Sequence, residues 1–150
     1  MRFRKIIIAI LCFAIAGYIS YWIKEIIDTR YPEYALPTVK VTADGQPLEV
    51  SMSDCSWSFL NGETYVVQPP DNLYDVSLPH NAVLGGEQLE IQFSQKVQVL
   101  RIYRSEPYSY NFIMAEEDLV IPYDKGGYIY QVYAQFERGY EMIYFYVVVE

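Results

Sequence analysis

The pattern of apolar and polar positions divides the chain into two parts. Residues 6–23 form a run without a charged side chain, whereas the chain after residue 38 alternates between apolar and polar positions in short runs. An uncharged run of this length predicts a helix of about 27 Å, close to the thickness of a bilayer's hydrocarbon core. Short alternating runs predict β-strands. We therefore expect one N-terminal helix followed by an all-β domain.

The residues that flank the apolar run predict how the helix is placed. Arg2, Arg4 and Lys5 precede the run, and Tyr21 and Trp22 stand near its end, where aromatic side chains favour a membrane interface. Basic residues ahead of a spanning helix favour a cytoplasmic N-terminus. We therefore expect a basic cytoplasmic tail over 1–5, a single transmembrane helix over 6–23, a helix extension and proline-containing spacer over 24–37, and an extracytoplasmic domain over 38–150.

A cleaved signal peptide is the alternative for this segment. Ala14 and Ala16 form the small-x-small pattern of a cleavage site, and cleavage following Ala16 would give a secreted protein. Apolar residues continue from Tyr18 to Ile23, beyond the expected cleavage point. This continuation favours an uncleaved signal-anchor in the cell membrane.

Strand signals recur about every ten residues in the body, with no competing helical pattern. Asp44-Gly45 is a hairpin signal, and residues 78–86 are typical of a loop. Regular short strands without helices between them predict an antiparallel β-sandwich. The expected strands cover residues 39–42, 48–52, 55–59, 64–67, 87–93, 97–104, 112–114, 116–122, 128–136 and 140–149.

Alternation assigns the faces of these strands, because successive side chains point to opposite sides. We expect one face of the last two strands to be buried, and the opposite face to hold Ile129, Tyr133, Tyr144 and Tyr146. Tyrosine is enriched at binding surfaces, since its ring is apolar and its hydroxyl polar. These four residues are the candidate binding face; packing within a core is the alternative. The expected buried sets are Leu89, Ile91 and Phe93; Cys55, Trp57 and Phe59; Tyr128, Tyr130, Val132, Ala134 and Phe136; and Ile143, Phe145, Val147 and Val149.

The segment DKGGYIY, residues 124–130, resembles the tyrosine corner of immunoglobulin-like sandwiches. Asp124, Gly126 and Tyr128 occupy the three positions of its Asp-x-Gly-x-Tyr pattern. The resemblance implies an immunoglobulin-like architecture, in which the Tyr128 hydroxyl bonds back to a backbone group. Tyr130 stands where antibody domains carry their second cysteine, so no inter-sheet disulfide is expected.

A series of motifs extends over about two-thirds of the chain: Cys55 and Trp57, Gly62, Asp71, the strand LEIQF, and PYDKGGYIYQVYA over 122–134. Their order resembles that of membrane-anchored or lipid-anchored surface proteins of Gram-positive bacteria, a group without an assigned chemistry. The resemblance implies location and fold and no catalytic or cofactor residues.

Charge and residue types limit the partners and the kinds of site that we expect. Residues 1–30 carry +3, which leaves −11 on the remaining 120 residues of a chain with net charge −8. Nucleic acid is therefore not an expected partner. We expect no catalytic, cofactor or metal residues: His80 is the only histidine, and Cys55 is expected to be a buried apolar side chain. The acidic residues Asp71, Asp75 and 116–118 match no calcium loop and are interpreted as solvated turns.

The sequence therefore favours a non-catalytic extracytoplasmic binding module, held in the bacterial membrane by its helix. Its expected partner is an envelope protein, a peptide or a glycan. One alternative is an accessory subunit that engages a membrane complex through the transmembrane helix. An enzyme is the remaining alternative, and no nucleophile, base or metal pattern in the sequence supports it.

Overall fold

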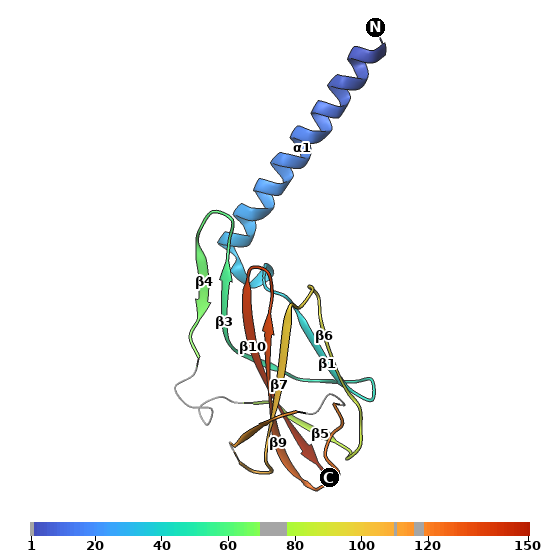
Figure 1. Ribbon diagram of the computed structural model, residues 1–150, viewed down its shortest axis with the longest axis vertical. Helices are drawn as coiled ribbons and strands as arrows, with labels where there is room; N and C mark the ends of the chain where they lie inside the picture. Colours follow the sequence, from blue (N-terminus) through green and yellow to red (C-terminus); the bar gives the residue numbers. More distant parts are fainter. Residues whose placement is uncertain (1, 70–77, 110, 116–118) are drawn as a thin grey trace. The chain divides into compact units, whose positions relative to one another are not determined.

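A computed structural model describes residues 2–69, 78–109, 111–115 and 119–150 (Figure 1). The chain divides into two compact units. One combines Met1–Leu36 with Ser58–Thr64, and the other combines Pro37–Trp57 with Tyr65–Glu150. The acidic residues Asp71, Asp75 and 116–118, which we expect to form solvated turns, lie outside the described residues.

The first unit contains the helix α1 (Arg2–Arg30) and the 3-10 turn η1 (Pro32–Tyr34). The helix ends two residues before Pro32, because proline cannot donate the backbone hydrogen bond that continues a helix. Residues Phe3–Arg30 are long and apolar enough to cross a membrane, and the protein buries none of their most apolar 18-residue window. Near the helix C-terminus the Glu25 carboxylate accepts a hydrogen bond from the Leu60 backbone N–H.

The second unit is built from two sheets, so the predicted all-β body is confirmed. The smaller sheet has the strand order β2-β1-β6, and the larger has β4-β3-β10-β9-β7-β8 with β5 added beside β10. The strands are β1 (Val39–Ala43), β2 (Gln46–Leu48), β3 (Ser51–Ser58), β4 (Thr64–Val67), β5 (His80–Val83), β6 (Leu89–Phe93), β7 (Val99–Ser105), β8 (Phe112–Met114), β9 (Gly126–Gln135) and β10 (Gly139–Val149).

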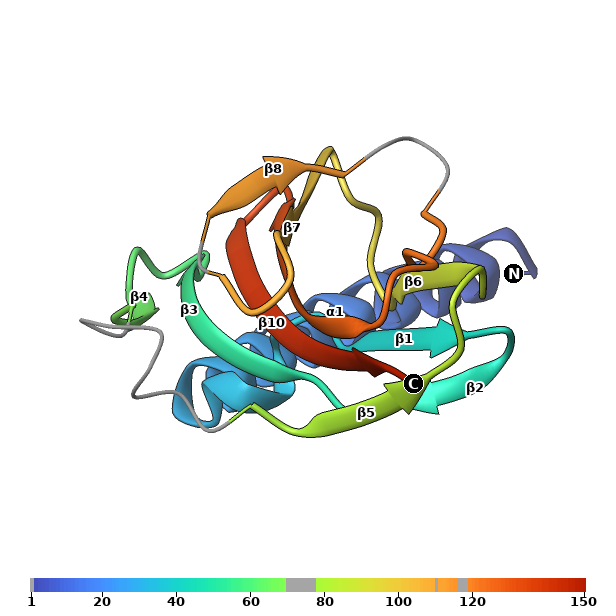
Figure 2. The same ribbon diagram turned by 90° about the horizontal axis from the view of Figure 1, so that it is seen from below.

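The long strand β10 organises the larger sheet. It pairs antiparallel with β9 along its whole length, and its other edge is shared by two strands. The first half of that edge pairs antiparallel with β3, and the second half pairs parallel with β5. Figure 2 shows β5 running beside the C-terminal end of β10. A bulge in the β3 pairing leaves Ser53 without an opposite residue, because Asp54 faces Met142 and Met52 faces Ile143.

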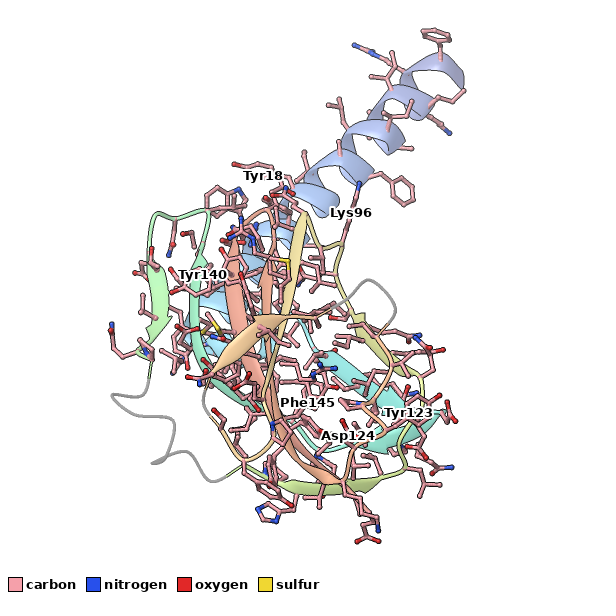
Figure 3. The ribbon with its side chains drawn as sticks, turned by 60° about the horizontal axis from the view of Figure 1, so that its bottom comes forward. Tyr18, Lys96, Tyr123, Asp124, Tyr140 and Phe145 are labelled. Carbon is pink, nitrogen blue, oxygen red and sulfur yellow. The ribbon has the colours of Figure 1, made fainter. Side chains whose placement is uncertain are left out.

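The core lies between the two sheets, and the predicted buried faces of β9 and β10 are confirmed. Phe145, labelled in Figure 3, is 0% exposed and stacks on Tyr130 at 4.9 Å. The ring of Phe93 from β6 meets Phe136 at 5.5 Å, which joins the sheets. Cys55 and Trp57 are buried as predicted. The core set is Val41, Ala43, Val83, Leu89, Ile121, Tyr128, Tyr130, Val132, Ile143, Phe145, Val147 and Val149.

Three local expectations differ from the structure. Within the strand predicted over 116–122, the described residues 119–122 form no strand, and only Val120 makes an isolated bridge, to Gln88. The predicted strands 48–52 and 55–59 are mostly one strand, β3, which belongs to the larger sheet. The loop predicted over 78–86 is wrong in part, because His80–Val83 forms β5. This strand carries loop-like residues, yet Asn81 is buried and its side-chain amide donates to the backbone oxygens of Glu49 and Tyr146.

Two turns explain local sequence signals. Asp44 and Gly45 have φ angles of 43° and 82°, and the two-residue loop joins β1 to β2 as the Asp-Gly signal predicts. At the entry to β9, the Tyr128 hydroxyl donates to the backbone oxygen of Asp124 at 2.9 Å, and Gly126 begins the strand. The hydrogen bond is of the kind that the tyrosine-corner resemblance implies; an immunoglobulin-like identity of the whole sandwich stays a prediction.

Candidate functional site

The candidate site lies on the face of the larger sheet that points away from the core, called the outer face below. Cross-strand pairing arranges its side chains in three rows that run from β3 through β10 and β9 to β7. The middle row places Asp54 at one end and Arg101 at the other. The rows are Ser56, Tyr140, Gln135 and Val99; Asp54, Met142, Tyr133 and Arg101; and Ser51, Tyr144, Gln131 and Tyr103.

A hollow of about 420 Å³ opens on this face, over β9 and β7. Its volume falls in the range of small-ligand sites, roughly 300–1,000 Å³. The lining combines one cation, two amides and two phenol rings with two apolar side chains. These residues are Val99, Arg101, Tyr103, Gln131, Tyr133, Gln135 and Met142.

Hydrogen bonds within the sheet hold the floor of the hollow in place. The Tyr133 hydroxyl donates to Oε1 of Gln135 at 2.6 Å, while Nε2 of Gln135 donates to the backbone oxygens of Phe136 and Gly139. The Tyr133 ring also lies against the Tyr140 ring, with centroids 5.6 Å apart. A side chain restrained in this way loses little freedom when a ligand contacts it.

A second amide organises the neighbouring row. Nε2 of Gln131 donates to the Tyr144 hydroxyl at 2.8 Å and to the Met142 sulfur. Both Gln131 protons are therefore engaged, and its Oε1 accepts no hydrogen bond from the described residues. Burial, with the charge of Asp54 as a smaller cause, raises the pKa of Tyr144, so its phenol stays neutral.

Charge is unevenly distributed along the middle row. Arg101 is exposed, and among the described residues it forms no ion pair and no acidic side chain lines the hollow. Asp54, three strands away, is 7% exposed, and its Oδ1 has no hydrogen-bond partner there. Burial raises the pKa of the Asp54 carboxyl.

The four residues of the candidate binding face differ in their burial and in their neighbours. Tyr133 is half-buried and lines the hollow. Tyr144 and Ile129 are each 7% exposed, so for them the packing alternative describes the structure. Tyr146 is half-buried, and its ring lies 4.9 Å from that of His80 on β5. Three of the four thus pack within the sheet, and Tyr133 alone among them lines the hollow.

Most of the hollow was missed from the sequence, although a signal exists. The alternation of VLRIYR places Val99, Arg101 and Tyr103 on one face of β7. That β7 is the neighbour of β9 depends on long-range pairing, which the local pattern does not carry.

Behind the hollow, the core side of the sheet contains a buried acid. Glu141 is 2% exposed and pairs across the strands with Cys55 and Ala134, which are both 0% exposed. Its Oε1 has no hydrogen-bond partner among the described residues, and burial raises its pKa to about 7. Burial likewise raises the pKa of the Cys55 thiol, which makes it a poor nucleophile.

The described residues of the outer face offer groups for binding. Its hollow contains hydrogen-bond donors, acceptors and ring faces, but no nucleophile beside a base. Among the described residues, no three His, Cys, Asp or Glu side chains are grouped so that they could hold a metal ion. Comparisons with protein-family models, curated proteins and solved structures find no match to this chain.

Proposed function

We propose that this chain is a non-catalytic binding module, held in a membrane by α1, whose β-domain recognises an envelope component outside the cytoplasm. The observation that carries the proposal is the hollow on the outer face, whose central ring, Tyr133, is fixed by Gln135. Such pre-organised polar and aromatic surfaces bind with a small entropic cost. The immunoglobulin-like architecture and the resemblance to Gram-positive surface proteins agree with this role and belong to the proposal.

The placement of the domain also belongs to the proposal. Arg2, Arg4 and Lys5 precede the apolar part of α1, which favours a cytoplasmic N-terminus and an extracytoplasmic β-domain. The exposed apolar surface of α1 fits a lipid environment, because no part of its most apolar window is covered by protein.

Site-specific photo-crosslinking in intact cells tests the binding role. We would replace Tyr103, which lines the hollow, with p-benzoylphenylalanine, and use the exposed Leu84 as the control position. The proposal predicts a discrete adduct from position 103 that disappears when Tyr133→Leu is added. Equal adducts from positions 103 and 84, or an adduct that Tyr133→Leu leaves unchanged, would contradict the proposal.

A helix exchange separates this function from that of an accessory subunit. Replacing residues 6–23 with an unrelated apolar helix preserves the membrane anchor and the outer face. A binding module keeps its position-103 adduct after this exchange. An accessory subunit that recognises its partner through the helix loses it.

A further inference from the structure

The free polar groups of the hollow point to a ligand class. The Tyr133 hydroxyl proton and both Gln131 Nε2 protons are already engaged. The groups without a partner among the described residues are the Arg101 guanidinium, the Tyr103 hydroxyl and the Gln131 carbonyl oxygen. A ligand therefore meets one cation and several neutral hydrogen-bonding groups.

The charge of this set favours an anion on the ligand. Arg101 is one of only six Lys or Arg residues after residue 30, and none of the described residues that line the hollow is acidic. A guanidinium binds carboxylate or phosphate oxygens with two parallel hydrogen bonds. The net charge of −11 on the body repels anions at long range, but salt screens charges beyond roughly 8 Å under physiological conditions. The contact with Arg101 therefore decides which sign of charge on a ligand the hollow prefers.

Asp54 does not cancel this preference. It lies at the far end of the middle row, with Met142 and Tyr133 between it and Arg101. Three strand spacings correspond to about 14 Å. An anion bound at Arg101 thus lies beyond the screening length from this acid, and the intervening row is neutral.

The position of the hollow favours a glycan over an extended peptide. A peptide that adds to a sheet uses the backbone groups of an open strand edge. Tyr133 and Gln131 lie on β9, whose backbone pairs with β10 on one side and β7 on the other. Recognition over β9 is therefore limited to side chains. Sugar hydroxyls pair with amide and phenol groups, and the C–H face of a sugar ring packs on an aromatic ring.

We propose that the hollow binds a glycan bearing a carboxylate or phosphate group, with the anion on Arg101 and a sugar ring against Tyr133. This inference rests on the proposed binding function and adds the ligand class to it. It assigns a separate role to each side chain: Arg101 sets the preference for acidic glycans, and Tyr133 contributes to the binding of acidic and neutral glycans alike.

The test uses the full chain in phosphatidylcholine nanodiscs and two matched pairs of probes. One pair is oligogalacturonate and its methyl ester, and the other is phosphomannan and dephosphorylated mannan. Dissociation constants are measured for the parent protein, Arg101→Gln, Tyr133→Leu and the control Lys125→Gln. Lys125 is exposed and does not line the hollow. Its replacement makes the same change in net charge as Arg101→Gln but leaves the hollow intact.

The proposal predicts that the acidic member of at least one pair binds roughly tenfold to a hundredfold more tightly than its neutral partner. Arg101→Gln removes this preference, Lys125→Gln retains it, and Tyr133→Leu weakens both members. The pair that responds identifies the anion as carboxylate or phosphate. Equal binding of acidic and neutral members, or a preference that survives Arg101→Gln, overturns the assignment.

Failure of this inference is distinguishable from failure of the binding function. If no glycan binds while the position-103 adduct still depends on Tyr133, the ligand class is wrong and the binding face stands. If the adduct is also absent, both proposals are wrong.

Discussion

The Tyr133 hydroxyl and the Gln135 amide lie 2.6 Å apart, two residues along the same strand, and the hydroxyl is the donor. The same amide donates to the backbone oxygens of Phe136 and Gly139 in the β9–β10 turn. One side chain thus connects the central ring of the outer face to the turn that starts β10. The orientation of Tyr133 is therefore part of the folded sheet and does not depend on a ligand.

Replacing Gln135 tests this connection. Gln135→Leu removes the acceptor of the Tyr133 hydroxyl and both hydrogen bonds to the turn, so the free energy of unfolding should fall by about 1–3 kcal/mol. The position-103 adduct should weaken as Tyr133 gains freedom. Gln92→Leu, on the exposed side of β6, is the control, and we expect a change within roughly 0.5 kcal/mol. Urea unfolding checks both values; equal stability of the two variants would contradict the account.

The buried Glu141 predicts a dependence of stability on pH. Burial raises its pKa from the ordinary value of 4.5 to about 7 in the folded protein. Between these two values the folded state binds more protons than the unfolded state, so stability falls as pH rises. The loss should be of order 3 kcal/mol between about pH 4.5 and pH 7, and stability should then level off. Urea unfolding of the full chain in micelles at a series of pH values measures it.

Glu141→Gln is the matched control for that profile. The amide cannot ionise, so most of the slope should disappear, and the variant should be more stable than the parent above pH 7. The pKa of Asp54 is also raised by burial, so it contributes a slope of the same sign in the variant. Stability that rises from pH 4.5 to pH 7 in the parent, or a slope that Glu141→Gln leaves unchanged, would show that Glu141 is not buried as described.

The close approach of β3 and β10 predicts that Gly139 tolerates no side chain. A Cβ at this position would lie 1.9 Å from the backbone oxygen of Ser56, which can move only if the strands separate. Gly139→Ala should therefore lower the free energy of unfolding by roughly 2–4 kcal/mol. At Gly126 the nearest atom is the Pro107 Cβ at 3.1 Å, so Gly126→Ala should cost clearly less. Thermal unfolding of both variants compares them directly.

The anchor proposal predicts that the mature protein keeps its first helix. The membrane fraction should yield a chain whose intact mass includes residues 1–16, and alkaline carbonate should not extract it. Ile15→Arg places a charge in the middle of the apolar run at a cost of about 2.5–3.5 kcal/mol and should reduce insertion, whereas Ile15→Val should not. A soluble product that begins at residue 17 would support cleavage following Ala16 instead.

Local patterns predicted much of this fold for identifiable reasons. The buried faces of β9 and β10 follow from strict alternation, and the Asp44-Gly45 turn follows from the positive φ angles at both of its residues. The end of α1 follows from Pro32. Each of these signals acts over a few residues. The two buried faces, the turn and the end of the helix could therefore be predicted from the sequence.

Long-range pairing explains what the sequence did not reveal. The residues of His80–Val83 are typical of a loop, and only the pairing with the edge of β10 and the amide of Asn81 make this segment a strand. The hollow needs β7 beside β9, a pairing between segments about thirty residues apart. Both faces of β10 carry apolar residues, so alternation alone does not show that Tyr144 is buried. Its hydroxyl accepts a hydrogen bond from Gln131 within the sheet.

The central claim, that the outer face is the binding surface, is tested most directly through the methionine methyl groups. Met142 lines the hollow, whereas Met52 is exposed and does not. Methyl-labelled full chain in nanodiscs is titrated with the soluble fraction released from the envelope of the producing cells, and NMR spectra are recorded. The account predicts that the Met142 methyl signal shifts while that of Met52 stays in place. An unchanged Met142 signal, with or without a shift at Met52, would contradict it.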